Sequence, residues 1–142
     1  MNPMLKRFMQ LGIRFHVWLY RRSGGKRAGE MEGKPLVLLT TKGKKTGLER
    51  TVPVMSFEDG SDRVVVASMG GAPQHPAWYQ NLVAHPEVKV QLGSEVYSAR
   101  AVVTDGDERD RLWNKIVGES PRFGGYQKKT SRLIPVVRLE RI

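Results

Sequence analysis

From residue 35 onward, short apolar runs alternate with turn signals, and this spacing restricts the fold more than any other feature of the sequence. The pairs Asp59-Gly60 and Gly93-Ser94 are typical of turns between antiparallel strands. Helical periodicity appears over residues 75–84 and 105–119. Pro53 lies within the second run, and because proline has no N–H to donate, we expect a sheet edge or a bulge there. The pattern predicts an α+β barrel of about six strands, not a doubly wound sheet, with strands at residues 35–41, 50–57, 63–68, 87–92, 95–104 and 132–141.

Residues 4–22 have the periodicity of an amphipathic helix with two opposite faces. The apolar face carries Leu5, Phe8, Met9, Phe15 and Leu19, and the basic face carries Lys6, Arg7, Arg14 and Arg21. Two interpretations stay open: the apolar face packs on the barrel, as in most amphipathic helices, or it lies on an anionic lipid surface. Residues 23–33 are rich in glycine and predict a mobile connector. We therefore expect residues 1–33 to form a basic helix with its connector and residues 34–142 to form the barrel domain.

The net charge of +10 on these 142 residues is concentrated in one part of the chain. Residues 1–50 contain twelve Lys and Arg against three Asp and Glu, and the remainder is nearly balanced. Such a segment predicts an anionic partner: nucleic acid, an anionic membrane surface or a multiply anionic small molecule. The absence of cysteine excludes disulfides and thiolate metal sites and favours the cytoplasm. We expect neither a secretory signal nor a membrane-spanning helix, since no uncharged apolar run approaches about 20 residues.

Several catalytic and nucleotide-binding motifs are missing from the sequence. It has no H-E-x-x-H, no G-x-S-x-G and no cysteine nucleophile, which argues against zinc hydrolysis and triad hydrolysis. The stretch that begins at Gly43 is similar to a phosphate-binding P-loop, but Leu38 stands where that motif requires glycine. The dinucleotide fingerprint G-x-G-x-x-G is also absent, which argues against nicotinamide binding on a Rossmann fold.

Two other segments do suggest chemistry. Residues 42–47 combine two glycines, a threonine and three lysines after the first strand, and Arg50 follows. Such a loop can offer N–H groups, a hydroxyl and ammonium groups to one phosphate, although a solvated hairpin is an equally good interpretation of the loop alone. Residues 67–73 end a strand with Gly70-Gly71, which lets a planar ligand approach the main chain. Taken alone, that segment is also compatible with an ordinary turn into a helix.

The order of these motifs resembles the deazaflavin-dependent nitroreductase and quinone reductase family. The matching segments are residues 40–47, 50–53, 67–82 and 85–88, within a resemblance that covers about residues 35–142. It implies a split β-barrel like the FMN-binding barrels, which binds coenzyme F420, a 5-deazaflavin with a multiply anionic tail. It also implies an enzyme that transfers a hydride from the reduced coenzyme to an electron-poor small molecule, such as a quinone, a nitroaromatic compound or an α,β-unsaturated lactone or enone.

The same resemblance assigns roles to individual residues. Contacts with the phosphate and tail are implied for Lys44, Lys45, Thr46, Gly47 and Arg50. The ring-lining set is Pro53, Met55, Ala67, Ser68, Met69, Gly70 and Gly71, and the site would be closed by Trp78 and Asn81. Ser68 and Tyr126 are the candidate catalytic hydroxyls, which would donate to the oxygen of the acceptor. For Tyr126 the alternative is an ordinary aromatic residue that anchors a glycine-rich turn over residues 122–127.

Three other functions are compatible with parts of the sequence. A flavin barrel of the pyridoxamine-phosphate-oxidase type would have the same architecture and would bind FMN in place of F420. A basic barrel that binds nucleic acid would need aromatic residues among its charges, and residues 40–51 contain none, so we expect no nucleic-acid partner. A peripheral membrane protein that uses residues 1–22 at the inner face of the cell membrane is compatible with quinone reduction. The oligomeric state stays open.

Overall fold

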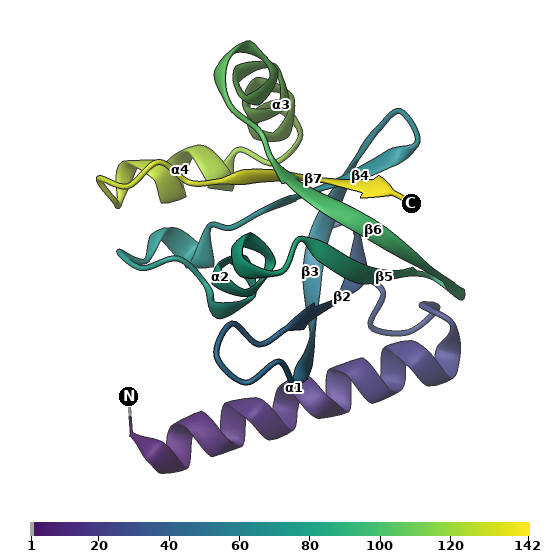
Figure 1. Ribbon diagram of the computed structural model, residues 1–142. Coiled ribbons are helices and arrows are strands. Elements are labelled where there is room, and N and C mark those ends of the chain that lie inside the picture. The colour runs from purple at the N-terminus through teal and green to yellow at the C-terminus, as the bar shows by residue number, and fades with distance from the viewer. Residues whose placement is uncertain (1) are drawn as a thin grey trace.

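A closed antiparallel barrel forms the body of the molecule (Figure 1). The structure is a computed structural model that describes residues 2–142. Six strands close in the order β2-β3-β4-β7-β6-β5 through a pairing of β2 with β5, and the two-residue strand β1 pairs with β2. The predicted α+β barrel is therefore confirmed. In chain order, the elements are α1 (Pro3–Ser23), β1 (Glu30–Met31), β2 (Lys34–Lys42), β3 (Glu49–Asp59), β4 (Asp62–Val66), η1 (Met69–Gly71), α2 (Ala77–Ala84), β5 (Glu87–Leu92), β6 (Glu95–Val103), α3 (Gly106–Glu119), α4 (Arg122–Lys128) and β7 (Val136–Arg141).

Strand β2 is buried on both faces, which explains why its sequence is a continuous apolar run. Leu36 and Leu38 join one core cluster, which also receives side chains from α1, α3 and α4. Val37 and Leu39 point the other way and join a second cluster built from β4, β5, β6, β7 and α2. Side chains alternate across a strand, so the single run of residues 36–39 supplies both clusters.

Strand β3 has an open edge in its first half. Pro53 lies opposite Leu38 of β2, and pairing with β4 begins only at Ser56. Since proline cannot donate a ladder hydrogen bond, it is tolerated where β3 has one neighbour. The predicted edge position of Pro53 is confirmed. Helix α1 contacts β3, and the Arg21 Nη2 donates to Thr51 Oγ1 at 3.3 Å.

The packing of helix α1 differs from the first of the two interpretations, in which its apolar face packs on the barrel. Val17 and Tyr20 are the buried residues of the helix. The Tyr20 hydroxyl donates to Leu36 O and accepts from Gly93 N, both at 2.8 Å, so the buried phenol is fully used in anchoring the helix. These anchors turn the apolar face outward, and its residues Leu5, Phe8, Met9 and Phe15 are exposed. Within residues 2–142, no helix meets the length and hydropathy of a membrane span.

Three local expectations need correction. Residues 122–128 form helix α4 and not a glycine-rich turn, because Phe123 is buried in the core and packs edge-on against Phe57. The last strand begins at Val136, so residues 132–135 lie outside the sheet. Helix α2 begins at Ala77, and not at residue 75. The glycine-rich connector contains β1, and the Ser23 hydroxyl donates to Arg27 O and accepts from Arg27 N. The mobility of the connector stays a prediction.

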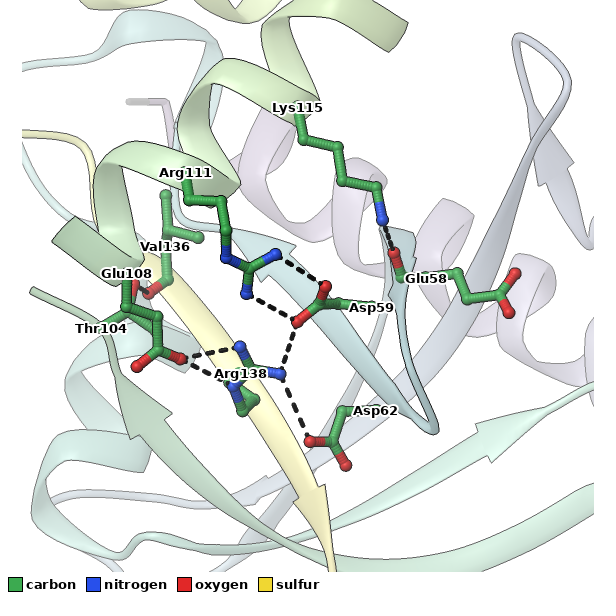
Figure 2. Close-up of polar contacts among 9 residues, drawn as sticks. All are labelled: Glu58, Asp59, Asp62, Thr104, Glu108, Arg111, Lys115, Val136 and Arg138. Carbon is green, nitrogen blue, oxygen red and sulfur yellow. Dashed lines mark hydrogen bonds and ion pairs between the residues drawn. The ribbon is translucent and has the colours of Figure 1, made fainter.

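An ion-pair network joins the β3–β4 turn to α3 and β7 (Figure 2). Asp59 accepts two hydrogen bonds from the Arg111 guanidinium at 3.1 and 3.2 Å, and a third contact comes from Arg138 at 2.7 Å. Arg138 also contacts Asp62 and Glu108 at 3.4 and 2.7 Å. The network fixes α3 on the end of the barrel away from the basic loop 42–47.

Replacing Asp59 by asparagine is expected to lower the free energy of unfolding by about 1–2 kcal/mol at neutral pH. The hydrogen bonds from Arg111 and Arg138 lower the pKa of Asp59 to about 2 from 3.8. The carboxylate therefore stabilises the fold fully above pH 3.8, and this contribution is lost as the pH falls through about 2. Urea unfolding of both proteins between pH 7 and pH 2 measures the difference. A difference in the free energy of unfolding between wild type and variant that stays constant from pH 7 to pH 2 would contradict the prediction.

Candidate functional site

A cleft of about 1290 Å³ lies between α1, the β2–β3 loop and the first turns of α2. In Figure 1 the β2–β3 loop is seen between α1 and α2. The volume exceeds the usual range of about 300–1,000 Å³ for small-molecule pockets, which suits an elongated ligand. One carboxylate, Glu49, is among the residues that line the cleft, together with seven cationic side chains: Lys6, Arg14, Arg21, Arg22, Lys44, Lys45 and Arg50.

The β2–β3 loop is a tight turn that needs glycine near both ends. Gly43 N donates to Leu48 O at 2.7 Å, and Gly47 N donates to Gly43 O at 2.9 Å. A Cβ on Gly43 would lie 2.6 Å from Thr46 Oγ1, and Gly47 has a φ of +72°, in the left-handed region. Thr46 Oγ1 accepts from Leu48 N at 3.2 Å and keeps its own proton for another acceptor. The turn leaves Lys44 and Lys45 exposed at the cleft.

Asn81 of α2 holds this loop in place. Its Oδ1 accepts from Lys44 N at 2.9 Å, and its Nδ2 donates to Thr41 Oγ1 at 3.2 Å. Asn81 is buried, and its bond to Thr41 is shielded from water, while the bond from Lys44 N is partly shielded. Trp78, one turn earlier on α2, also lines the cleft and packs against the second core cluster. Both residues therefore lie at the cleft, and Asn81 positions the loop backbone.

The segment predicted to receive the ring lies outside the cleft lining. Ala67 and Ser68 are buried, while Met69 is 57% exposed with a φ of +47°, a conformation that strains a residue other than glycine. Gly70 has a φ of +65°, and a Cβ there would meet open space. In contrast, a Cβ on Gly71 would lie 2.7 Å from Tyr126 O, so this glycine is needed for packing against α4.

The other predicted residues fall into two groups. Met55 lies in the first core cluster, on which Tyr126 also packs, and the Tyr126 ring meets Phe123 edge-on at 5.6 Å. Because α4 contacts η1, the segments that carry Ser68 and Tyr126 lie side by side. The structure thus gathers Lys44, Lys45, Thr46, Arg50, Trp78 and Asn81 around the cleft and places the ring-lining residues apart from it. The roles assigned to all of these residues stay predictions.

Arg132 is a residue of the site that the sequence did not reveal. Its guanidinium donates to Ala67 O at 3.1 Å, Ser68 O at 2.8 Å and Ala72 O at 2.9 Å, and contacts His75 Nδ1 at 3.0 Å. Burial, together with the Arg132 charge, lowers the pKa of His75, which favours the neutral ring that can accept from Arg132. Arg132 was assigned to the last strand, and no local pattern marks an arginine that binds carbonyls 60 or more residues away.

Metal chemistry has no visible site in the described part of the chain. Among residues 2–142, no group of three or more His, Cys, Asp or Glu side chains could hold a metal ion. What these residues offer is a cationic cleft for an elongated anion, beside a corner in which Gly70 leaves the main chain open.

Comparison with known proteins identifies relatives across most of the chain. An F420H(2)-dependent quinone reductase of Mycobacterium tuberculosis is 39% identical over 134 residues, which cover 91% of this chain and 89% of that protein. A solved F420-H2 dependent reductase, FDR-A, is 45% identical, with a TM-score of 0.69 over 75% of this chain and 94% of that chain. A solved domain-swapped dimer is 36% identical, with a TM-score of 0.72 over 98% of this chain and 100% of that chain.

More distant structures share the barrel only. A FAD-binding protein of Mesorhizobium loti has a TM-score of 0.51 at 14% identity, which is a likeness of fold. The family model of the F420H(2)-dependent quinone reductases, in contrast, matches residues 12–141. On this match and on the identity with the mycobacterial enzyme, the chain belongs to the F420H(2)-dependent quinone reductase family.

Proposed function

We propose that this protein is an oxidoreductase that transfers a hydride from reduced coenzyme F420 to a quinone or a similar electron-poor acceptor. Membership of the quinone reductase family supports the reaction. The single structural observation that carries the proposal is the cleft, in which seven cations face one carboxylate. Glu49, that carboxylate, is paired with Lys89 at 3.4 Å. The donor set fits a coenzyme with a phosphate and a multiply anionic tail.

The chain would bind the coenzyme in two parts. Lys44, Lys45 and Arg50, with the Thr46 hydroxyl and the turn at Gly47, bind the phosphate and the tail. Trp78 and Asn81 close this part of the site from α2. When bound, the reduced deazaflavin supplies a hydride, that is, two electrons and one proton. The ring is assigned to a set of residues outside the cleft lining, at β3 and the η1 corner: Pro53, Met55, Ala67, Ser68, Met69, Gly70 and Gly71.

The acceptor needs a hydrogen-bond donor at the oxygen that becomes negative. A quinone that gains a hydride becomes a hydroquinone monoanion, and one further proton gives the neutral hydroquinone. We assign this donation to the Ser68 and Tyr126 hydroxyls, on segments that pack together. The Ser68 side chain makes no capping hydrogen bond to η1, so its hydroxyl is not used by that helix.

The experiment that tests the function measures oxidation of reduced F420 by the purified protein with menaquinone analogues, nitroimidazoles and α,β-unsaturated lactones. We expect turnover with at least the quinones and a colourless protein as purified. If the purified protein is yellow with bound FMN and does not oxidise reduced F420, it is instead a flavin-binding barrel of the pyridoxamine-phosphate-oxidase type. Tight binding of single-stranded DNA with a steep salt dependence, and no turnover, would favour the nucleic-acid function.

Replacing Tyr126 by phenylalanine is expected to lower turnover about tenfold to a hundredfold with little change in the dissociation constant of F420. The substitution removes a hydroxyl and keeps the ring that packs on Phe123. Stopped-flow oxidation of the bound reduced coenzyme gives the rate, and coenzyme fluorescence gives the affinity. Tyr97→Phe, on β6 beside Arg141, is the matched control. Equal turnover in the Tyr126 variant and this control would remove Tyr126 from the mechanism.

We also propose that the protein is cytoplasmic and that α1 places it on the inner face of the cell membrane. Phe8 and Phe15 are 74% and 63% exposed and lie outside the cleft lining. Trp18, at the rim of the cleft, is 53% exposed. Apolar and aromatic residues on one face with Lys and Arg on the same helix are typical of helices at anionic lipid surfaces. Quinones with long apolar chains partition into lipid, so such a position would bring enzyme and acceptor together.

Vesicle flotation tests the membrane proposal. We expect the protein to float with anionic vesicles and not with zwitterionic ones, and Phe8→Ser with Phe15→Ser to reduce the bound fraction at least about tenfold. Val96→Ser with Leu133→Ser removes two other exposed apolar side chains and should leave binding unchanged. If the outer face instead pairs with a second copy, light scattering will give a dimer that the Phe8 and Phe15 changes dissociate, and flotation will be absent.

A further inference from the structure

We propose that the inner face of α1 is a second wall of the coenzyme site, which binds the oligoglutamate tail and makes affinity depend on tail length. The proposal rests on the proposed function and adds residues that the resemblance did not assign. We define the inner face by Lys6, Gln10, Arg14, Val17 and Arg21, all of which line the cleft. Ile13, Trp18 and Arg22 line the cleft at the two margins of this face. In the sequence, Lys6, Arg14 and Arg21 were expected only to be solvated or to lie above lipid.

The spacing of these residues makes one continuous stripe. Residues 6, 10, 14, 17 and 21 follow each other at intervals of three or four, so they lie on the same side of a helix. Between Lys6 and Arg21 the helix rises about 22 Å, at 1.5 Å per residue. A stripe of this length can run beside several residues of an extended anionic chain.

The stripe is held at a fixed distance from the barrel. Tyr20 anchors the C-terminal half of α1 through Leu36 O and Gly93 N. Arg21 Nη2 reaches Thr51 Oγ1, which itself lies 2.7 Å from Thr40 Oγ1 of β2. These contacts orient the first half of the helix, with Lys6 and Arg14, over the cleft opposite the basic loop.

The positive charges on both walls of the cleft favour the binding of an anion between them. Lys6 and Arg14 on one wall face a cleft that also contains Lys44, Lys45 and Arg50, and within residues 2–142 none of these five forms an ion pair with a carboxylate. Like charges across a cleft repel each other and raise the local concentration of anions. Lys6 and Arg14 are exposed and line the cleft, so an anion bound there can reach both side chains.

The test compares two forms of oxidised F420, one with a long glutamate tail and one that ends at the phospholactyl group, by fluorescence titration at low salt. We expect the wild-type protein to bind the long-tailed form about tenfold more tightly. In Lys6→Gln with Arg14→Gln, this advantage should fall to about twofold or less, while affinity for the tail-free form stays unchanged.

The matched control is Arg7→Gln with Lys26→Gln, which removes the same charge from exposed positions outside the cleft lining. This control should keep the tenfold preference. Two results would contradict the binding of the tail by α1 and leave the proposed function intact. The preference for the long-tailed form could fall equally in both double variants, or it could persist in Lys6→Gln with Arg14→Gln. If the wild-type protein binds neither form, the proposed function fails together with the inference.

Discussion

Replacing Lys44, Lys45 and Arg50 together by glutamine is expected to weaken F420 binding about a hundredfold. The three side chains are exposed at the cleft and would each make a charge-assisted contact with the phosphate or the tail. Solvent screening limits each contact to about 1 kcal/mol, and the sum of about 3 kcal/mol corresponds to that change in the dissociation constant. Fluorescence titration of oxidised F420 measures it, and the salt dependence of binding should become shallower.

The fold should survive this triple substitution. None of the three cations forms an ion pair within the described residues 2–142, and the turn is held by Gly43, Gly47 and the Asn81 bonds to the loop. We therefore expect an unchanged melting temperature. A control with Arg7, Lys26 and Arg100 changed to glutamine removes three exposed charges elsewhere. An unchanged dissociation constant in the Lys44, Lys45 and Arg50 variant would show that the loop does not bind the coenzyme.

The barrel was predictable because its signals are local. A few neighbouring residues are enough to predict the strand at residues 35–41, the turn at Asp59-Gly60 and the edge position of Pro53. Strand β2 shows how: both of its faces are buried, so a continuous apolar run predicts it without knowledge of its partners. The basic loop at the cleft was found for the same reason, since its glycines and lysines are neighbours in sequence.

Elements whose role depends on distant contacts were not predictable in this way. The face that α1 turns to the barrel is decided by Tyr20, whose hydroxyl meets Leu36 O and Gly93 N. Helix α4 contains Gly124 and Gly125 and is helical because Phe123 finds a place in the core. Asn81 was expected at the site from its motif, but its bond to Lys44 N shows that it acts on the loop.

Replacing Arg132 by methionine is expected to lower both the free energy of unfolding and the turnover. It removes donors from Ala67 O, Ser68 O and Ala72 O, at a cost of about 3 kcal/mol if each lost bond contributes about 1 kcal/mol. The corner that carries Ser68 would then lose its fixed position, and a displacement of about 1 Å can reduce a hydride-transfer rate about a hundredfold. We expect a smaller loss, about threefold or less, in F420 affinity, because none of the hydrogen bonds of the Arg132 guanidinium reaches the residues proposed to bind the tail.

Two comparisons separate this positioning role from general destabilisation. Arg141→Met removes a surface arginine that pairs with Glu95 at 2.8 Å and should leave turnover unchanged. The second comparison uses His75, whose pKa is lowered from 6.5 by burial and by Arg132. Neutral His75 contributes stability that is fully present above pH 6.5 and is lost as the pH falls through its lower folded-state pKa. In Arg132→Met, the free energy of unfolding should fall less steeply with decreasing pH than in the wild-type protein. An equal fall in the wild-type protein and the variant would mean that Arg132 does not hold His75 and the Ser68 corner as one unit.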